Sequence, residues 1–396
     1  MQVCAFEELT IRSYDEQKDK ARVDAFERNC DVGPPHRSVF LFTDSMGDPI
    51  SRIRHSPLYN MLVAEIRGEV VGVVRGTIKV ARVLSSPAGP SKVGYVLGLR
   101  VSPLHRQKGI GGNLVRRLEE WFAANWVDYV YMATEKDNEA SVRLFVDRLG
   151  YVKFRTPAIL VNPVRRSRPY GGGGGAVRVY RLSVEAAESL YRGVMGAAEF
   201  FPEDIGDVLR NKLSLGTWVA EAVGSGHHPG LEPGSGPRSW AMVSVWNSGE
   251  VFKLRLGKAP LSWRACARGC RWVDRVLPCL KVPLIPDLFR AFGFYFLYGV
   301  HREGPDSGRL VRTLFEFVHD MAAKSGPRDC RVVVTEVGGW DSALKLWVPH
   351  SKVMSCAEDL WCVKALNWGG LAGVLMQELV SGRTPSRALF VDPREV

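Results

Sequence analysis

The clearest chemical pattern lies in residues 106–112, Arg-Gln-Lys-Gly-Ile-Gly-Gly, between an apolar run that predicts a strand and an amphipathic run that predicts a helix. The first N–H groups of a helix have no partner inside it, and the helix dipole favours an anion there. Gly109 and Gly111 place no side chain over these groups, and Arg106 and Lys108 add positive charge. The pattern predicts a loop that binds a pyrophosphate group. The alternative is a glycine-containing turn that binds nothing.

The elements around this loop predict an α/β domain with a mixed sheet. They are a strand pair at 61–66 and 70–78 that turns at Arg67-Gly68, strands at 94–101 and 129–134, a helix with Leu114, Val115, Leu118, Trp121 and Phe122 on one face, a second helix that begins after Asn138 and ends at Gly150, and a strand at 152–159.

Two motifs in this order resemble the acetyl-CoA signature of the GNAT superfamily of N-acyltransferases. They are Arg-x-x-Gly-x-Gly after a strand and the segment NEASVRLFVDRLGY at 138–151, and the resemblance covers about residues 8–160. The segment VLGLRVSPLHRQKGIG and the presence of an added C-terminal half resemble the plant hookless-type N-acetyltransferases. The resemblance implies a GNAT fold with a mixed central sheet, and direct transfer of acetyl from acetyl-CoA to an amine of a protein or small molecule. It also implies ethylene-responsive control of differential growth in the seedling hook, and a nuclear location.

The resemblance also assigns residues to acetyl-CoA. Backbone groups of Leu99, Arg100 and Val101 would contact the pantetheine arm, and Asn138 would lie near the thiol end. The pyrophosphate would be held by Arg106, Gln107, Lys108, Gly109, Ile110, Gly111 and Gly112.

Two positions depart from the family pattern. Many members carry a Tyr that protonates the thiolate, where this chain has Phe145, and several carry a Glu base where this chain has Tyr95. The candidate bases are Glu135, His105 and Tyr95. Each has an alternative role without catalysis: Glu135 as a surface carboxylate, His105 as a solvated turn residue and Tyr95 as a packed aromatic. A second functional hypothesis is therefore a weak or inactive GNAT-fold regulator that acts through protein interactions.

The C-terminal half repeats the first half in a diverged form. GGNLVRRLEEWF from Gly111 matches SGRLVRTLFEFV from Ser307, and Glu336 follows a strand as Glu135 does. The loop at 301–308 lacks the two glycines and carries Glu303 and Asp306. We expect a GNAT domain at 1–162, a basic and glycine-rich linker at 163–177, and a second GNAT-like domain at 178–396 that binds no phosphate and offers a surface for a protein partner or self-association. Chance similarity between two amphipathic helices is the alternative.

Composition adds few constraints. With 53 Lys and Arg against 42 Asp and Glu, the net charge of +11 suits an acidic ligand, nucleic acid or ordinary solubility, and no stacking platform indicates direct nucleic-acid binding. No apolar run is long enough to span a bilayer, so we expect a soluble intracellular protein. Cys266, Cys270 and Cys279 do not have zinc spacing, so buried free thiols are favoured and no metal is expected. The acceptor side is expected around residues 25–60, where Phe26, Arg37, Arg52 and Arg54 are candidates, and in the last strands.

Overall fold

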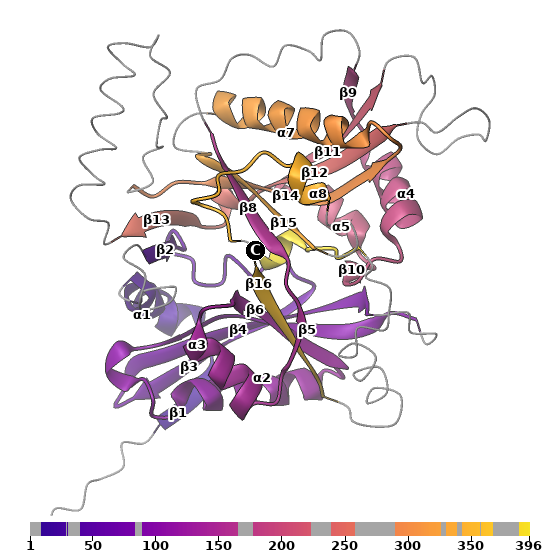
Figure 1. Ribbon diagram of the computed structural model, residues 1–396. Coiled ribbons are helices and arrows are strands. Elements are labelled where there is room, and N and C mark those ends of the chain that lie inside the picture. The colour runs from indigo at the N-terminus through magenta and orange to yellow at the C-terminus, as the bar shows by residue number, and fades with distance from the viewer. Residues whose placement is uncertain are drawn as a thin grey trace, which may run out of the picture.

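The computed structural model shows two twisted sheets that pack face to face, each with helices on its outer side (Figure 1). It describes residues 9–28, 30, 40–83, 89–164, 177–222, 239–257, 290–325, 330–338, 343–356, 358–366 and 388–396. We call residues up to 164 the N-terminal half and residues from 177 onward the C-terminal half. None of the helices in the described ranges combines the length and apolar character that crossing a bilayer requires.

The first sheet is built mainly from the N-terminal half. Its strands lie in the order β1 (Leu9–Ser13), β3 (Leu58–Ile66), β4 (Glu69–Arg82), β5 (Ser91–Val101), β6 (Tyr129–Glu135), β16 (Asp359–Ala365) and β7 (Val152–Arg155), and the short β10 (Phe201–Pro202) also pairs with β4. Helix α2 (Ile110–Ala124) covers one face with its predicted apolar stripe, and α1 (Glu16–Arg28) packs on the other. The predicted turn is confirmed, since Arg67 and Gly68 both have positive φ.

The second sheet repeats the same plan. Its order is β8 (Ala158–Pro163), β15 (Val332–Val337), β14 (Phe294–Glu303), β12 (Trp240–Asn247), β11 (Ser214–Ala222) and β9 (Val177–Arg181). Helix α7 (Ser307–Lys324) lies on its outer face (Figure 1), while α4 (Val184–Met195) and α5 (Ile205–Arg210) join the core between the sheets. The order strand, loop, helix, strand, one-turn helix α8 (Leu344–Trp347) is the order that the internal repeat predicts.

Each half contributes to the sheet of the other half. β8 leaves the N-terminal half to pair with β15, and β16 returns from the C-terminal half to lie between β6 and β7, as the colours in Figure 1 show. The prediction of one strand at 152–159 was wrong, because the chain breaks at Thr156-Pro157 and the two pieces belong to different sheets. Proline has no N–H for a central ladder, which explains the break. The domain division at 162 and 178 stays a prediction. The first sheet contains β16 and the short β10 from the C-terminal half, and the second contains β8 from the N-terminal half.

The largest apolar core lies between the sheets. From the first sheet it takes Tyr131 and Trp361, whose rings stack 5.4 Å apart, and from the second it takes Phe296. Residues 388–396 also lie between the two sheets, and Phe390 is buried there. A further strand pair, β2 (Phe40–Asp44) with β13 (Lys253–Gly257), joins the halves at one side.

Candidate active site

Strands β5 and β6 separate in the middle of the first sheet. Their parallel ladder ends at Val96 and Met132, although β5 continues to Val101 and β6 to Glu135. Gly98 has a φ of 61°, in the left-handed region, and the register between β4 and β5 shifts at this point. The bulge therefore turns the end of β5 away from β6. Residues 97–101 therefore pair with β4 on one side and have no ladder partner in β6 on the other.

The predicted loop follows directly and is open to solvent. Residues 106–109 are exposed, and Gly109, with a φ of 81°, is the N-cap of α2. The first helical bond runs from the Asn113 N–H to the Gly109 carbonyl at 3.0 Å, so the N–H groups of residues 110–112 precede it. A Cβ on Gly109 would meet nothing within 4 Å, and one on Gly111 would make ordinary contacts at 3.6 Å. An open helix end with exposed Arg106 and Lys108 beside it fits a phosphate group.

Two other predicted contacts have local roles in the fold. Asn138 caps the short helix α3 (Glu139–Val142), and its side-chain oxygen accepts from the Ser141 N–H at 3.3 Å. The Arg100 side chain points away from α2, and its guanidinium donates to the Glu27 carbonyl at 3.3 Å and to Thr43. Only the Arg100 backbone is therefore available to the space beside β6. The predicted roles of these residues in acetyl-CoA binding stay predictions.

The departure at Phe145 has a structural consequence. Its ring is 2% exposed and meets the Tyr151 ring edge-on at 5.1 Å, in the irregular helix Arg143–Arg148. Phe145 packs the core under α2 and supplies no proton. Any proton donor for a leaving thiolate must come from another element.

The three candidate bases have different surroundings. Tyr95 lies between the sheets, 4.8 Å from the Tyr131 ring, and burial raises its pKa far above the ordinary value, which disfavours it as a base. His105 lies in the turn Pro103–His105, ahead of the loop and partly buried. Glu135 ends β6 on the face between the sheets, directly opposite Asp359 of β16.

Asp359 forms part of an acidic cluster that the sequence alone did not identify. Burial and the charge of Glu135 raise the pKa of Asp359 to about 7. From the second sheet, Glu336 accepts a hydrogen bond from the Trp361 indole N–H at 2.8 Å, and burial and Asp359 raise its pKa to about 8. A carboxyl that titrates near neutral pH can take a proton from an amine. Asp359 could not be found from a local motif, because only the strand exchange brings it beside Glu135.

The equivalent place in the C-terminal half is closed. Gly299, with a φ of 60°, repeats the bulge of Gly98, but the Trp347 ring lies over Gly308 at the start of α7, where a Cβ would overlap it. The Asp306 N–H donates to the Ser239 hydroxyl at 3.0 Å. This helix end is thus covered by the chain itself.

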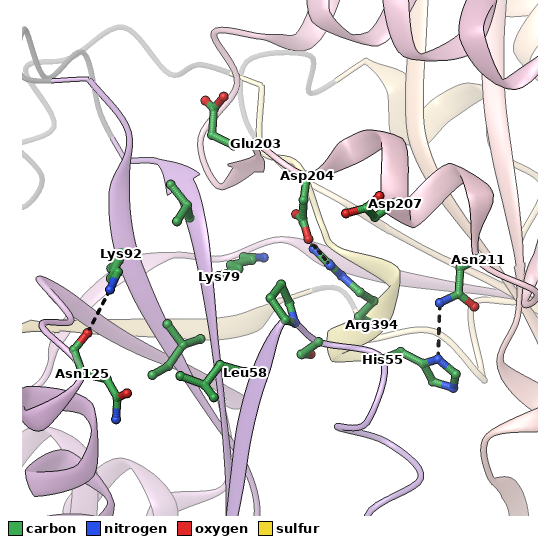
Figure 2. Close-up of a pocket in the computed structure, with 14 residues that line it drawn as sticks. His55, Leu58, Lys79, Lys92, Asn125, Glu203, Asp204, Asp207, Asn211 and Arg394 are labelled. Carbon is green, nitrogen blue, oxygen red and sulfur yellow. Dashed lines mark hydrogen bonds and ion pairs between the residues drawn. The ribbon is translucent and has the colours of Figure 1, made fainter.

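A cavity of about 670 Å³ lies at the other end of β5, beside Lys92 (Figure 2). Asp204, Asp207 and Glu203 line one wall, and Arg394 bridges to Asp204 at 2.6 Å. The cavity lies far along β5 from the glycine loop, so it is not part of the candidate active site.

Other predicted sites remain open. In the ranges that the structure covers, no group of three or more His, Cys, Asp or Glu residues could hold a metal ion. The acceptor-side candidate Arg37, the cysteines at 266, 270 and 279 and residues 165–176 of the predicted linker lie outside the described residues.

Comparison with known proteins identifies the family. Residues 20–151 match the acetyltransferase (GNAT) family. Over nearly the whole chain, the sequence is 46% identical to the probable N-acetyltransferase HLS1 of Arabidopsis thaliana, covering 97% of this chain and 99% of that protein. It is 44% identical to the probable N-acetyltransferase HLS1-like of the same plant, covering 98% and 99%. The chain belongs to this family of GNAT N-acetyltransferases. The resemblance to the GNAT superfamily and to the plant hookless-type proteins is therefore confirmed.

A solved structure supports the fold. N-myristoyltransferase of Saccharomyces cerevisiae, with bound myristoyl-CoA, superposes with a TM-score of 0.53 at 10% identity, over 91% of this chain and 80% of that one. Such a likeness at this identity shows the fold alone. It extends across both sheets, which agrees with the repeated arrangement described above.

Proposed function

We propose that this protein transfers an acetyl group from acetyl-CoA directly to an amine of a protein or small molecule. The observation that carries the proposal is the open glycine loop at the start of α2, next to the point where β5 and β6 separate. The N–H groups of residues 110–112 would bind the pyrophosphate, with Arg106 and Lys108 beside it. The backbone of residues 99–101 would bind the pantetheine arm, and the thioester would then lie between the two strand ends.

The Glu135–Asp359 pair is our proposed general base. The acceptor amine must lose a proton before or during its attack on the thioester carbon, and a carboxyl whose pKa is about 7 is matched to that task near neutral pH. As the C–N bond forms, the C–S bond breaks and the thiolate takes a proton. The same carboxyl pair holds one at that moment, which compensates for the absence of a tyrosine at Phe145. His105 is the alternative base.

A thiol-release assay with a panel of amines tests the proposal. We expect the wild-type protein to release coenzyme A in the presence of an acceptor, and the Gly111→Glu variant to release none above background. The matched control is Arg309→Glu, which places the same carboxylate near the start of α7, in the half that has no open loop. Equal activity of wild type and Gly111→Glu would contradict the proposal.

A non-catalytic regulator is the second candidate, favoured by the buried Phe145 at the usual position of the proton donor. Acetyl-CoA binding without any turnover would favour it. In either case the C-terminal half, with its covered helix end, would act as a platform for the acceptor or a protein partner. The resemblance supports a role in plant growth control and a nuclear location, which imaging of a tagged chain would test.

A further inference from the structure

Two arginines meet one carboxylate beside the bulge of β5, and a third arginine lies close enough to act on its charge. Arg75 of β4 forms a bidentate pair with Glu27 of α1, with both N–O distances 2.8 Å, and its Nε donates to the Pro49 carbonyl at 2.8 Å. The Nε of Arg100 lies 3.7 Å from the same carboxylate. Arg52 is the third arginine, and its guanidinium lies over the Phe252 ring, 4.8 Å from the centroid.

The positive charge in this cluster exceeds the negative charge. Arg75 occupies both oxygens of Glu27, which is 6% exposed. The Nε of Arg52 is buried and has no acceptor among the residues that the structure describes. Burial and the neighbouring Arg75 and Arg100 lower the pKa of Arg52 to about 10, so the surroundings do not compensate its charge. Buried charges in proteins are normally paired. Among the described residues, the carboxylate that acts on Arg52 is Glu27, and Arg75 already holds both of its oxygens.

The cluster lies beside the bulge at which β5 parts from β6. Arg75 and Arg100 project from the face of the sheet opposite to α2, and a Cβ on Gly98 would come within 2.8 Å of the Arg75 guanidinium. Arg52 is close enough to Tyr95 to affect its pKa. Gly98 marks the point where β5 leaves β6, so the arginines border the proposed thioester position. The carboxyl pair Glu135–Asp359 lies on the β6 side of the same opening.

We propose that Arg52, supported by Arg75 and Arg100, binds an anionic oxygen group of the acceptor, so that the acceptor is an amine with a carboxylate or phosphate close to its nitrogen. This inference rests on the proposed acetyltransferase function. The arginines would hold the anion on the β5 side, and the carboxyl pair would face the amine on the β6 side. Charge-assisted contacts of this kind fix orientation as well as adding affinity.

The anion site can be tested without knowing the acceptor. Phenylglyoxal labels accessible arginines, and mass spectrometry gives the rate at each site. At constant ionic strength, we expect inorganic phosphate or acetate to slow the labelling of Arg52 several-fold relative to chloride. Comparing phosphate with acetate shows whether the site prefers a phosphate or a carboxylate. Arg312, exposed on α7, is the internal reference. The proposal would be overturned if Arg52 were not labelled at all, or if its labelling rate were the same in all three salts. Equal protection of Arg52 by acetyl-CoA alone would also overturn it, because Arg52 would then lie in the acetyl-CoA site.

Acceptor selectivity gives the second readout. Peptides that carry a lysine next to aspartate, phosphoserine or asparagine are compared in kcat/KM with the wild type and Arg52→Gln. We expect the acidic peptides to be preferred by about tenfold or more, mostly through KM, and Arg52→Gln to remove the preference. Arg312→Gln, an exposed arginine of α7 paired with Glu316, is the matched control and should keep it.

The two proposals fail in different ways. Loss of the preference in both variants, or no preference in the wild type, would contradict the role of Arg52. Unchanged acetyl-CoA affinity in Arg52→Gln would show that the donor site is intact. If the wild type acetylates no amine, the acetyltransferase proposal fails, while the labelling result still decides whether Arg52 binds an anion.

Discussion

The two halves of the molecule share a bulged strand followed by a helix, and they differ in the loop between them. Gly98 and Gly299 both adopt left-handed φ, at 61° and 60°. Thirteen residues lie between Gly98 and Gly112, but only eight lie between Gly299 and Gly308. The longer loop ends in an open helix N-terminus, whereas Trp347 covers the shorter one. The bulge is thus common to both halves, and the loop decides whether the start of the following helix is open.

The space beside the second bulge is occupied by the chain itself. A Cβ on Gly299 would overlap the buried Tyr191 ring, and Leu389 and Val391 line a remaining cavity of only about 50 Å³. Tyr191 in turn hydrogen-bonds the Ser244 hydroxyl at 2.7 Å. The space beside the bulge therefore differs between the two halves: it belongs to the candidate active site in the N-terminal half and is filled by packed side chains in the C-terminal half.

The largest expected effect is on kcat/KM and concerns the carboxyl groups that end the equivalent strands β6 and β15. Asp359 faces Glu135, whereas the residue that β8 places opposite Glu336 is Ile159. We expect Asp359→Asn to lower kcat/KM about 100-fold, because the general base is lost. In the wild type, kcat/KM should rise with pH to about 7 and then level off, since the base acts when deprotonated. Glu358→Gln, an exposed neighbour paired with Lys136, should change neither. A profile that is flat from pH 6 to 8 would exclude this assignment.

The two bulge glycines should differ in their contribution to stability. An alanine at either position carries the strain of a left-handed φ, about 1 kcal/mol. Gly299→Ala also overlaps the buried Tyr191, which adds about 1–3 kcal/mol, whereas Gly98→Ala meets the end of the longer Arg75 side chain. Urea unfolding should therefore show a larger loss of unfolding free energy for Gly299→Ala. Equal losses would mean that the second bulge is not packed as described.

A smaller effect is expected at Glu336. Its folded pKa of about 8 lies above its ordinary value of 4.5, so between these values the folded state keeps a proton that the unfolded state has lost. The unfolding free energy should fall as pH rises through this window. Glu336→Gln should reduce that slope and stabilise the protein at pH 8.5, with the Trp361 hydrogen bond retained. Chemical denaturation at pH 5 and 8.5 checks this, and a variant less stable at pH 8.5 would contradict the assignment.

The local features of the fold could be read from the sequence. The stripe of α2, the turn at Arg67-Gly68 and the cap at Asn138 depend on neighbours within a few residues, and the structure confirms them. The internal repeat correctly predicted the order of elements around α7.

The long-range features could not be read in the same way. The strand exchange depends on which edge each terminal strand meets, and Pro157 was its only local signal. Asp359 reaches Glu135 through that exchange. Arg52 was a candidate for the acceptor side, but its excess charge became visible only when Arg75, Arg100 and Glu27 were brought together.

The most direct test of the account is calorimetric titration of acetyl-CoA into the full chain and into Gly111→Glu. We expect one binding site per chain in the wild type and no binding in the variant, because the introduced carboxylate would lie at the open start of α2, whereas Trp347 covers the start of α7. Two sites per chain, or binding that persists in Gly111→Glu, would contradict the central claim that the N-terminal half alone binds acetyl-CoA.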